Sequence, residues 1–348
     1  MKPALIYTGG TIGSAGEPLE PLAYIDFQAL WQRHVESRLG APRSWHWIER
    51  PVDSTEAAPG NWLGLARLVL DAGANGPVIM LHGTDTLAWS TSALAMLLTL
   101  FDSDAVPVGR HSQRVVVTGS QRPLFSDEGI APGTDAIANL ELAYNVISDA
   151  GAGVTVAFAG ETLPGARVMK VSATDDRAFA CPRGWVPVPD LPEAEASALS
   201  AQLDLLTPHF GRKIVLPILA APAEPDLHLG LVDAAIRFAG NRLGAIHLHG
   251  FGIGNFPAGS LLAPVLAAAH QAGALIVADS QTPGGAMDPG TYGAGSWLAD
   301  LGALSAGDMT PAAVDAKLHL TLALGAANSW SRERMEEFFL TPAAGERS

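Results

Sequence analysis

The sequence predicts an α/β fold with two domains, each built on a mostly parallel sheet covered by helices. The chain has 348 residues, more than one hydrophobic core usually organises. Short apolar runs alternate with segments of helical length, the pattern of βαβ units. Hydrophobic residues make up 48% of the chain and charged residues only 16%, which indicates a well-packed globular protein.

The individual elements follow from the positions of these runs. Strands are expected at Ala4–Tyr7, Pro77–Leu81, Arg114–Thr118, Gly153–Phe158, Lys213–Leu216, Ala245–Leu248 and Leu275–Ala278. Helices are expected at Asp26–Leu39, Trp62–Ala72, Ser90–Leu100, Asp135–Ser148, Leu229–Ala239 and Ser260–Gln271. A stretch that begins proline-rich, Val186–Leu205, indicates a connection between two halves. We therefore expect an N-terminal domain at 1–187, a linker at 188–211 and a C-terminal domain at 212–348.

Composition and charge exclude several classes of protein. The net charge of −14 argues against nucleic acid or an anionic membrane as a partner, since both require basic surfaces. Cys181 is the single cysteine, so neither an internal disulfide nor a multi-cysteine metal site is expected. We find no apolar run of about 18 residues and no signal-peptide pattern at the N-terminus. The sequence therefore predicts a cytoplasmic protein without a metal or cofactor.

Four short turns follow the strands of the first half, and they are rich in hydroxyl groups. Carboxyl ends of parallel strands meet at one edge of a sheet, so these turns should line one cleft: Thr8–Gly13, His82–Thr86, Gly119–Pro123 and Gly160–Lys170. The first reads TGGTIG, and its glycine spacing does not match a dinucleotide fingerprint. Its glycines instead suggest close approach of the backbone to something small.

The second turn places a hydroxyl beside a carboxylate, at Thr84 and Asp85. Capping of the following helix is an alternative explanation for both side chains. A hydroxyl is a weak nucleophile unless a base removes its proton. The candidate bases near this edge are His82, Asp85 and Lys170, and a lysine can serve where burial lowers its pKa. The alternative for Lys170 is an ordinary solvated charge.

Two histidines in the second half, His247 and His249, alternate along an expected strand and would therefore face the same side. That arrangement suits a metal ion, but the sequence shows no third ligand at useful spacing, so a structural role is favoured.

Taken together, the turns resemble the bacterial-type L-asparaginase family, and more closely its cytoplasmic type I branch. TGGTIG at Thr8–Gly13 and LHGTDT at Leu81–Thr86 are similar to the two threonine signatures of that family. The segments 117–143, 173–175 and 293–324 resemble the family as well, in the same order along the chain. The resemblance implies an asparaginase/glutaminase-like fold and hydrolysis of L-asparagine to L-aspartate and ammonia, with L-glutamine as a possible weaker substrate.

The resemblance also implies roles for individual residues. Thr11 is similar to the nucleophilic threonine, and Thr84, Asp85 and Lys170 to the second catalytic group, in which the lysine helps to deprotonate Thr84 or a water. Asp85 would accept the α-ammonium group of the substrate. In the similar substrate loop, the ligands of the α-carboxylate would be Ser54 and Thr55. No cofactor or metal is implied.

The resemblance is less direct at the lid and at the subunit interface. The family has a tyrosine on a mobile lid after the first threonine. Here Tyr24 is the only tyrosine in that segment, whereas alignment on Pro21 puts Leu19 at the position. Family members form dimers or tetramers, and Asn255 is similar to a residue that reaches a neighbouring site. The segment Ser280–Met287 lacks the cysteine found at the allosteric site of some type I enzymes.

Two other functions stay open. The family domain also occurs in an ammonia-supplying subunit of a tRNA amidotransferase, which carries an additional N-terminal module, whereas TGGTIG here starts at Thr8. The chain could also be an amino-acid sensor that keeps the pocket without turnover.

Overall fold

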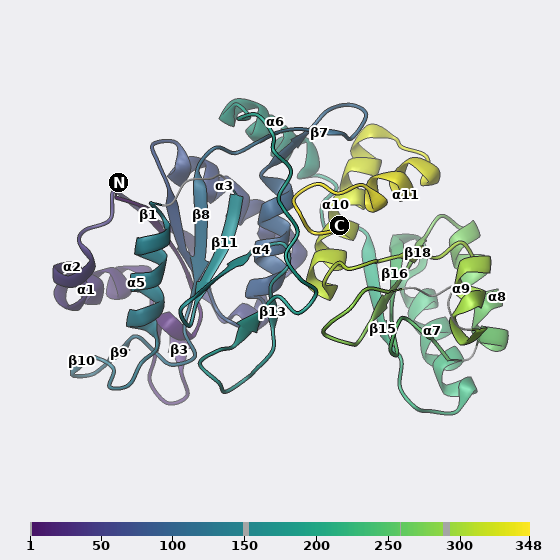
Figure 1. The fold of residues 1–348 in the computed structure, drawn as a ribbon, viewed down its shortest axis with the longest axis horizontal. Helices are drawn as coiled ribbons and strands as arrows, with labels where there is room; N and C mark the ends of the chain where they lie inside the picture. The colour runs from purple at the N-terminus through teal and green to yellow at the C-terminus, as the bar shows by residue number, and fades with distance from the viewer. Residues whose placement is uncertain (1, 149–152, 258, 288–292) are drawn as a thin grey trace. The chain divides into compact units, whose positions relative to one another are not determined.

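The computed structural model describes residues 2–148, 153–257, 259–287 and 293–348 (Figure 1). The chain divides into two compact units, of which the first comprises residues up to Cys181 together with Val188–Asp204. The second comprises Pro182–Pro187 and Leu205–Ser348. The stretch 188–204, expected to be linker, thus groups with the first unit and contains most of helix α6 (Ala196–Leu206).

A six-stranded sheet forms the centre of the first unit, in the order β12-β11-β8-β5-β1-β4. Its strands are β1 (Ala4–Gly9), β4 (Trp45–Val52), β5 (Val78–Leu81), β8 (Arg114–Thr118), β11 (Gly153–Phe158) and β12 (Glu161–Pro164). All neighbouring pairs are parallel except β11 with β12. The mostly parallel sheet confirms the predicted fold class and the four strands expected in this half.

Helices cover both faces of this sheet, and Figure 1 shows α5 and α4 flanking it on opposite sides. The helices are α1 (Tyr24–His34), α2 (Glu36–Leu39), α3 (Pro59–Gly73), α4 (Leu87–Leu97) and α5 (Ala136–Val146). Alternate strand residues such as Leu5 and Tyr7 pack with Phe27 and Trp31 of α1 in one core cluster. Every residue of helix α4 except Trp89 is buried, which is consistent with its largely apolar sequence.

Short two-stranded pairs and 3-10 helices lie in the connections between the larger elements of the first unit. These are the pairs β2 (Ser14–Ala15) with β3 (Glu20–Pro21), β6 (Thr99–Phe101) with β7 (Pro107–Arg110), β9 (Phe125–Ser126) with β10 (Gly129–Ile130), and β13 (Met169–Lys170) with β14 (Phe179–Ala180), and the 3-10 helices η1 (Thr11–Gly13) and η2 (Ser54–Glu56). They place Thr11, Ser54 and Lys170 just beyond the sheet, next to the carboxyl ends of its strands.

The second unit contains a four-stranded parallel sheet in the order β15-β16-β17-β18. Its strands are β15 (Ile214–Leu219), β16 (Leu243–Gly250), β17 (Leu275–Ser280) and β18 (Leu304–Ser305). Its helices are α7 (Pro225–Ala239), η3 (Gly240–Arg242), α8 (Gly259–Gln271), α9 (Gly293–Asp300), α10 (Pro311–Asn328) and α11 (Arg332–Leu340). A separate core cluster joins this sheet to α7 and α8, so the two-core prediction is confirmed.

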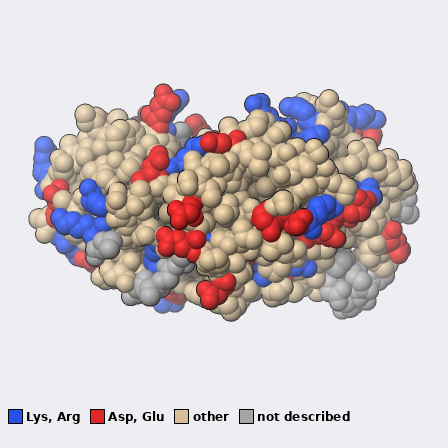
Figure 2. All heavy atoms as spheres, turned by 90° about the horizontal axis from the view of Figure 1, so that it is seen from above, with Lys and Arg blue, Asp and Glu red and all other residues tan. Residues whose placement is uncertain are grey.

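No helix within the described ranges is both long and apolar enough to span a bilayer. On the face shown in Figure 2, lysine and arginine side chains are scattered among acidic ones and do not form a continuous band.

Candidate active site

The turns after β1 and β5 are in backbone contact. A Cβ atom added to Gly10 would lie 2.3 Å from Cα of Gly83, so only glycine permits this approach. Gly10 also has φ of +76° and ψ of 178°, a conformation that is essentially restricted to glycine. The two threonine-bearing turns, which are distant in sequence, therefore converge as expected for parallel strands.

Two further segments join the same cluster of turns. A Cβ on Gly83 would lie 2.6 Å from Oγ of Ser54, and the Thr86 hydroxyl donates to Ser54 O at 2.8 Å. A Cβ on Gly119 would lie 2.3 Å from the carbonyl oxygen of His82. These contacts pack the η2 segment and the turns after β1, β5 and β8 against one another. They leave no room for a Cβ atom at Gly10, Gly83 or Gly119.

Lys170 joins this cluster from β13. Its Nζ donates to Oγ1 of Thr84 at 2.9 Å and to Oδ1 of Asp85 at 2.6 Å. One ammonium group therefore connects the hydroxyl and the carboxylate that the sequence singled out. Capping does not explain these side chains, because the N-cap of α4 is Thr86 and it makes no side-chain capping bond.

Thr11 begins η1 and is half-buried. The other hydroxyls of this turn are engaged, since Thr8 donates to Leu81 O at 2.9 Å and Ser14 donates to Gly10 O at 2.9 Å. Among the described residues, the Thr11 hydroxyl has no hydrogen-bond partner. It is therefore the hydroxyl of this turn that is available to a ligand.

In the η2 segment, Ser54 is buried against Gly83, whereas Thr55 is exposed. The Thr55 hydroxyl and backbone N–H both donate to Oδ1 of Asp53 at 2.8 Å. Asp53 thus fixes the shape of the segment that was expected to bind a carboxylate.

His82 is fully buried, with Nδ1 2.7 Å from the carbonyl oxygen of Gly83. Burial lowers the pKa of His82, so its imidazole is neutral at pH 7. Of the three bases expected here, Asp85 and Lys170 contact each other, whereas His82 contacts the backbone of Gly83.

The sequence did not single out Asp135 and Asn139, which shape the third turn. Both carboxylate oxygens of Asp135 accept backbone N–H groups of the segment 121–122, at 2.8 and 3.0 Å. Asn139 donates to Gly119 O at 3.0 Å and accepts the N–H of Ala159 at 2.8 Å. Asp135 is the N-cap of α5 and Asn139 lies four residues later in that helix, and this spacing was the available signal.

The segment expected to form a lid consists of the β2–β3 hairpin followed by α1. Leu19 lies in the hairpin turn with 52% of its surface exposed. Tyr24 is the first residue of α1, and its ring stacks on Trp47 with a centroid distance of 3.7 Å. In the second unit, Asn255 closes a turn with Phe251, and no partner among the described residues contacts its buried Oδ1.

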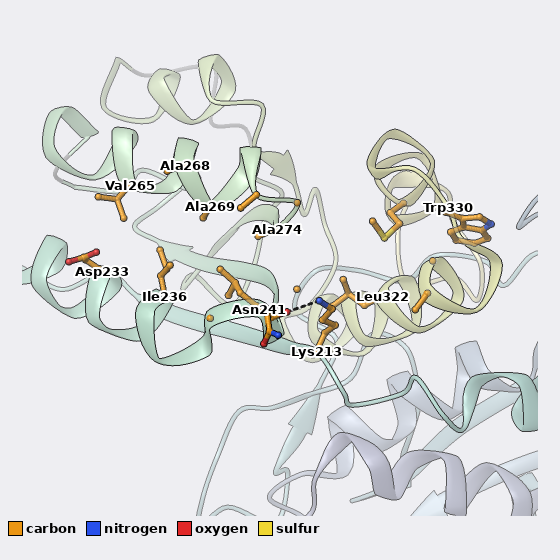
Figure 3. A pocket seen from close by; sticks show the side chains of 18 of the residues that line it. Lys213, Asp233, Ile236, Asn241, Val265, Ala268, Ala269, Ala274, Leu322 and Trp330 are labelled. Carbon is orange, nitrogen blue, oxygen red and sulfur yellow. Dashed lines mark hydrogen bonds between the residues drawn. The ribbon is translucent and has the colours of Figure 1, made fainter.

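One cavity in each unit bears on where a ligand binds. In the first unit, a cavity of about 590 Å³ lies beside the converging turns and is lined in part by Thr8, Ser54 and His82. Thr11, Thr84, Asp85 and Lys170 are not among the described residues that line it. In the second, an apolar cavity of about 910 Å³ lies near the amino ends of β16 and β17, with Lys213 bonded to Asn241 O at its edge (Figure 3). Parallel sheets bind ligands at the opposite, carboxyl edge, which favours the first unit as the reactive site.

Comparison with known families bears on the whole chain. Residues 3–186 match the model "Asparaginase, N-terminal", and residues 226–339 match "Glutaminase/Asparaginase C-terminal domain". The chain belongs to the asparaginase family.

Relatives of this asparaginase-family chain carry two kinds of names. It is 28% identical over 333 residues to L-asparaginase 1 of Escherichia coli strain K12, covering 91% of this chain and 90% of that protein. It is 27% identical over 363 residues to a glutamyl-tRNA(Gln) amidotransferase component of Pyrobaculum aerophilum, covering 99% of this chain and 79% of that protein. Its fold is similar to that of the L-asparaginase from Thermococcus kodakarensis, with a TM-score of 0.75 over 100% of this chain and 99% of that one, at 24% identity.

Proposed function

We propose that this protein hydrolyses the side-chain amide of L-asparagine to L-aspartate and ammonia. The observation that carries this proposal is the contact of Lys170 Nζ with both Thr84 Oγ1, at 2.9 Å, and Asp85 Oδ1, at 2.6 Å. A hydroxyl, a carboxylate and a cation within bonding distance can activate a nucleophile and hold a charged substrate. Membership of the asparaginase family supports an amide as the bond that is cleaved.

In the proposed reaction, Oγ1 of Thr11 attacks the amide carbon and the amide nitrogen leaves as ammonia. Water then cleaves the resulting ester, releases aspartate and restores the threonine. Each step passes through an oxyanion, and backbone N–H groups at the glycine turns are suited to stabilise it. The unengaged hydroxyl of Thr11 supports its assignment as the nucleophile.

Thr84 and Lys170 act as the proton-transfer pair in this proposal. To accept a proton, the lysine amine must be uncharged when substrate is bound. The distance of 2.9 Å between Nζ of Lys170 and Oγ1 of Thr84 would let a proton pass between the two groups.

Asp85, Ser54 and Thr55 recognise the ends of the amino acid in this proposal. Asp85 accepts the α-ammonium group, and the η2 hydroxyls and N–H groups donate to the α-carboxylate. L-Glutamine is proposed as a weaker substrate, since one methylene is worth about 1–3 kcal/mol of discrimination in such a pocket. We place Tyr24 on the lid as a candidate proton-transfer residue.

The test is ammonia release from L-asparagine by purified protein and four variants. Thr11→Ala and Thr84→Ala should each lower kcat by at least about 10³-fold, as expected when a nucleophile or its activating group is removed. Thr11→Ser keeps a hydroxyl and should retain part of the activity. Thr174→Ala, at an exposed threonine, is the matched control. Full activity in both alanine variants would refute the site assignment.

The amidotransferase relatives motivate one further measurement. An asparaginase should release ammonia from free asparagine at a rate that charged tRNA does not change. A sensor should bind L-aspartate without measurable turnover, and an ammonia-supplying subunit should prefer glutamine in the presence of tRNA. We further propose a homodimer or homotetramer in the cytoplasm, with Asn255 serving a neighbouring subunit; light scattering and an Asn255→Ala variant test this assembly.

A further inference from the structure

The second unit brings together three side chains that can bind a metal ion. His247 and His249 lie on the same face of β16, because side chains two residues apart on a strand share a face. The neighbouring strand β17 supplies Asp279, which lies opposite His249 in the parallel register. One ligand atom from each of these three residues lies within 4.8 Å of the others. The third ligand that the sequence did not reveal thus comes from the next strand.

We propose that His247, His249 and Asp279 form a binding site for a divalent transition-metal ion, with Zn²⁺ as the ion whose preferences fit best. Zinc is commonly bound by imidazole nitrogens and carboxylate oxygens, and three protein ligands leave a fourth position for water. None of these three residues is among those proposed for amide hydrolysis, and the bound ion would link β16 to β17.

The distances between donor atoms fit this ion. Nε2 of His247 lies 3.5 Å from Oδ2 of Asp279, and Nδ1 of His249 lies 3.8 Å from the same oxygen. Both distances exceed the usual range of about 2.7–3.2 Å for an N–H···O hydrogen bond. Donors bound to one tetrahedral zinc at about 2.0–2.2 Å lie roughly 3.3–3.6 Å apart. Both distances to Asp279 are close to this range, and the two histidine donors lie within 4.8 Å of each other.

Two of the donor atoms are otherwise unsatisfied. Within the described residues, neither Nε2 of His247 nor Oδ2 of Asp279 has a hydrogen-bond partner. Both side chains are completely buried. Leaving such atoms unpaired in a protein interior is unfavourable. A bound cation would satisfy both atoms at once.

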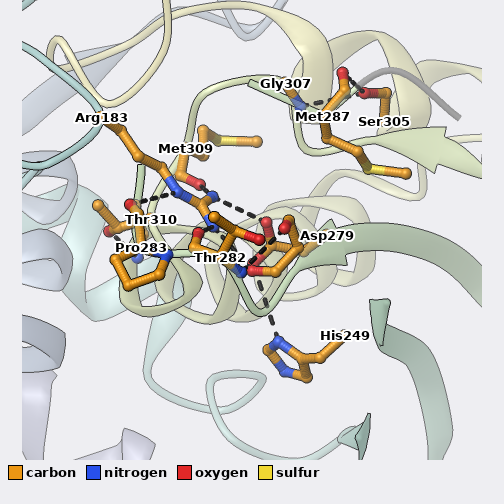
Figure 4. Close-up of polar contacts among 12 residues, drawn as sticks. Arg183, His249, Asp279, Thr282, Pro283, Met287, Ser305, Gly307, Met309 and Thr310 are labelled. Carbon is orange, nitrogen blue, oxygen red and sulfur yellow. Dashed lines mark hydrogen bonds and ion pairs between the residues drawn. The ribbon is translucent and has the colours of Figure 1, made fainter. Parts of the chain in front are cut away.

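Neighbouring residues hold these ligands in orientation. Nδ1 of His247 lies 2.8 Å from Oδ1 of Asp315, which leaves Nε2 directed at the site. Hydrogen bonding of a ligating imidazole to a carboxylate is typical of zinc sites. Arg183 donates to Oδ1 of Asp279 at 2.8 Å and leaves the other oxygen available (Figure 4).

Charge and access are compatible with a cation. When a cation replaces the proton of His247, the carboxylates of Asp279 and Asp315 and the guanidinium of Arg183 leave one net negative charge to balance it. The side chain of His249 is 15% exposed, whereas those of His247 and Asp279 are at 0%, so an ion can enter beside His249.

A proton is the competitor for the same position. Burial lowers the pKa of His247, but the neighbouring carboxylates of Asp279 and Asp315 outweigh that effect and raise it to about 9. The alternative to a metal site is therefore an imidazolium held between two carboxylates, and zinc binding decides between them.

The experiment uses the full chain, free of any polyhistidine tag and dialysed against a chelator. Calorimetric titration with Zn²⁺ should show one ion per chain, and Co²⁺ should produce the visible absorption of a tetrahedral complex. His249→Ala should abolish both signals. Asp315→Asn, which removes only the orienting carboxylate, should weaken zinc binding about 10–100-fold.

His209→Ala is the matched control, at a histidine of the same unit outside the cluster, and it should bind zinc like the unmodified chain. Absence of zinc binding by the unmodified chain would overturn the proposal in favour of the protonated network. Unchanged binding by His249→Ala would overturn the ligand assignment. Circular dichroism establishes that each variant is folded.

Discussion

Gly10 and Gly83 touch through their backbones, and no larger residue fits at either contact: a Cβ on Gly10 would lie 2.3 Å from Cα of Gly83. This contact sets the distance between the turn that carries Thr11 and the turn that carries Thr84. The geometry of the proposed active site thus depends on two residues that have no side chain.

Replacement of Gly10 by alanine should therefore lower both stability and activity. The backbone conformation alone, with φ of +76° and ψ of 178°, costs a side chain about 1–3 kcal/mol, and the clash adds to it. Gly40 provides a matched control, since its φ of 82° and ψ of 163° are similar but nothing lies within 4 Å of an added Cβ. Denaturant unfolding and ammonia release should show a larger loss of stability for Gly10→Ala and a loss of activity for that variant alone. Equal effects of the two substitutions would mean that the contact is unimportant.

Lys170→Met should depress turnover and leave substrate binding largely intact. The lysine is proposed to act on a proton and not on the ends of the substrate, so kcat should fall by about 10²–10⁴-fold. The dissociation constant of L-aspartate, measured by calorimetry, should change by less than about tenfold. Lys213→Met, at a lysine bonded to Asn241 O in the other unit, serves as the control. A loss of affinity as large as the loss of kcat would assign the lysine to binding instead.

Tyr24→Phe tests the lid assignment without disturbing packing. The substitution removes the hydroxyl but keeps the ring that stacks on Trp47, so the melting temperature should hardly change. If the hydroxyl transfers a proton, kcat should fall by about 10²-fold or more. Leu19→Ala removes the alternative lid residue, whose side chain is exposed, and should retain activity. The reverse outcome would move the lid function from Tyr24 to position 19.

Because Glu346 and Lys317 form a buried ion pair, the free energy of unfolding should decrease at acid pH. Burial raises the pKa of Glu346, but the Lys317 charge and backbone N–H groups, including that of Ala344 at 2.7 Å, outweigh it and lower the pKa below 4.5. A carboxyl whose pKa is lower in the folded state adds stability above the unfolded value and loses it as the pH falls. Unfolding free energy should therefore decrease from about pH 4.5 downward.

Glu346→Gln isolates this contribution. At pH 7 the variant leaves Lys317 buried without its anion and should be about 3–5 kcal/mol less stable. The difference from the unmodified chain should shrink as the pH falls, because the carboxylate is then protonated. Glu128→Gln, at an exposed glutamate, should behave like the unmodified chain at every pH. A constant difference across the pH range would contradict the charged pairing.

Much of the architecture could be predicted because apolar runs and helical segments mark local structure. Strand β4 was missed because its sequence, WHWIERPV at Trp45–Val52, mixes aromatic, charged and proline residues. It lies at one end of the sheet order and pairs only with β1, so burial does not impose a continuous apolar run. Helices α10 and α11 were not predicted either, although Pro311 stands in the first turn of α10 and Thr310 caps it.

Site residues could be predicted where they are close together in the sequence. They could not be predicted where their contact depends on which strands pair and in which register. Thr84 and Asp85 are adjacent in sequence, and parallel topology explains their approach to the first turn. The sequence could not show that Asp279 lies opposite His249, because neither segment alone determines the register between the two strands. The stacking of Tyr24 on Trp47 was likewise invisible, since β4 had not been predicted.

Arg183 lies in the short segment Pro182–Pro187 and binds residues that are distant in sequence, on the second unit. It donates to Asp279 and to the backbone oxygens of Ser280, Thr282 and Met309. A fragment cut at residue 205 would lack this guanidinium and retain a buried, uncompensated aspartate. Any attempt to express the C-terminal half by itself should therefore append the hexapeptide 182–187, and a simple truncation at the apparent boundary should yield insoluble material.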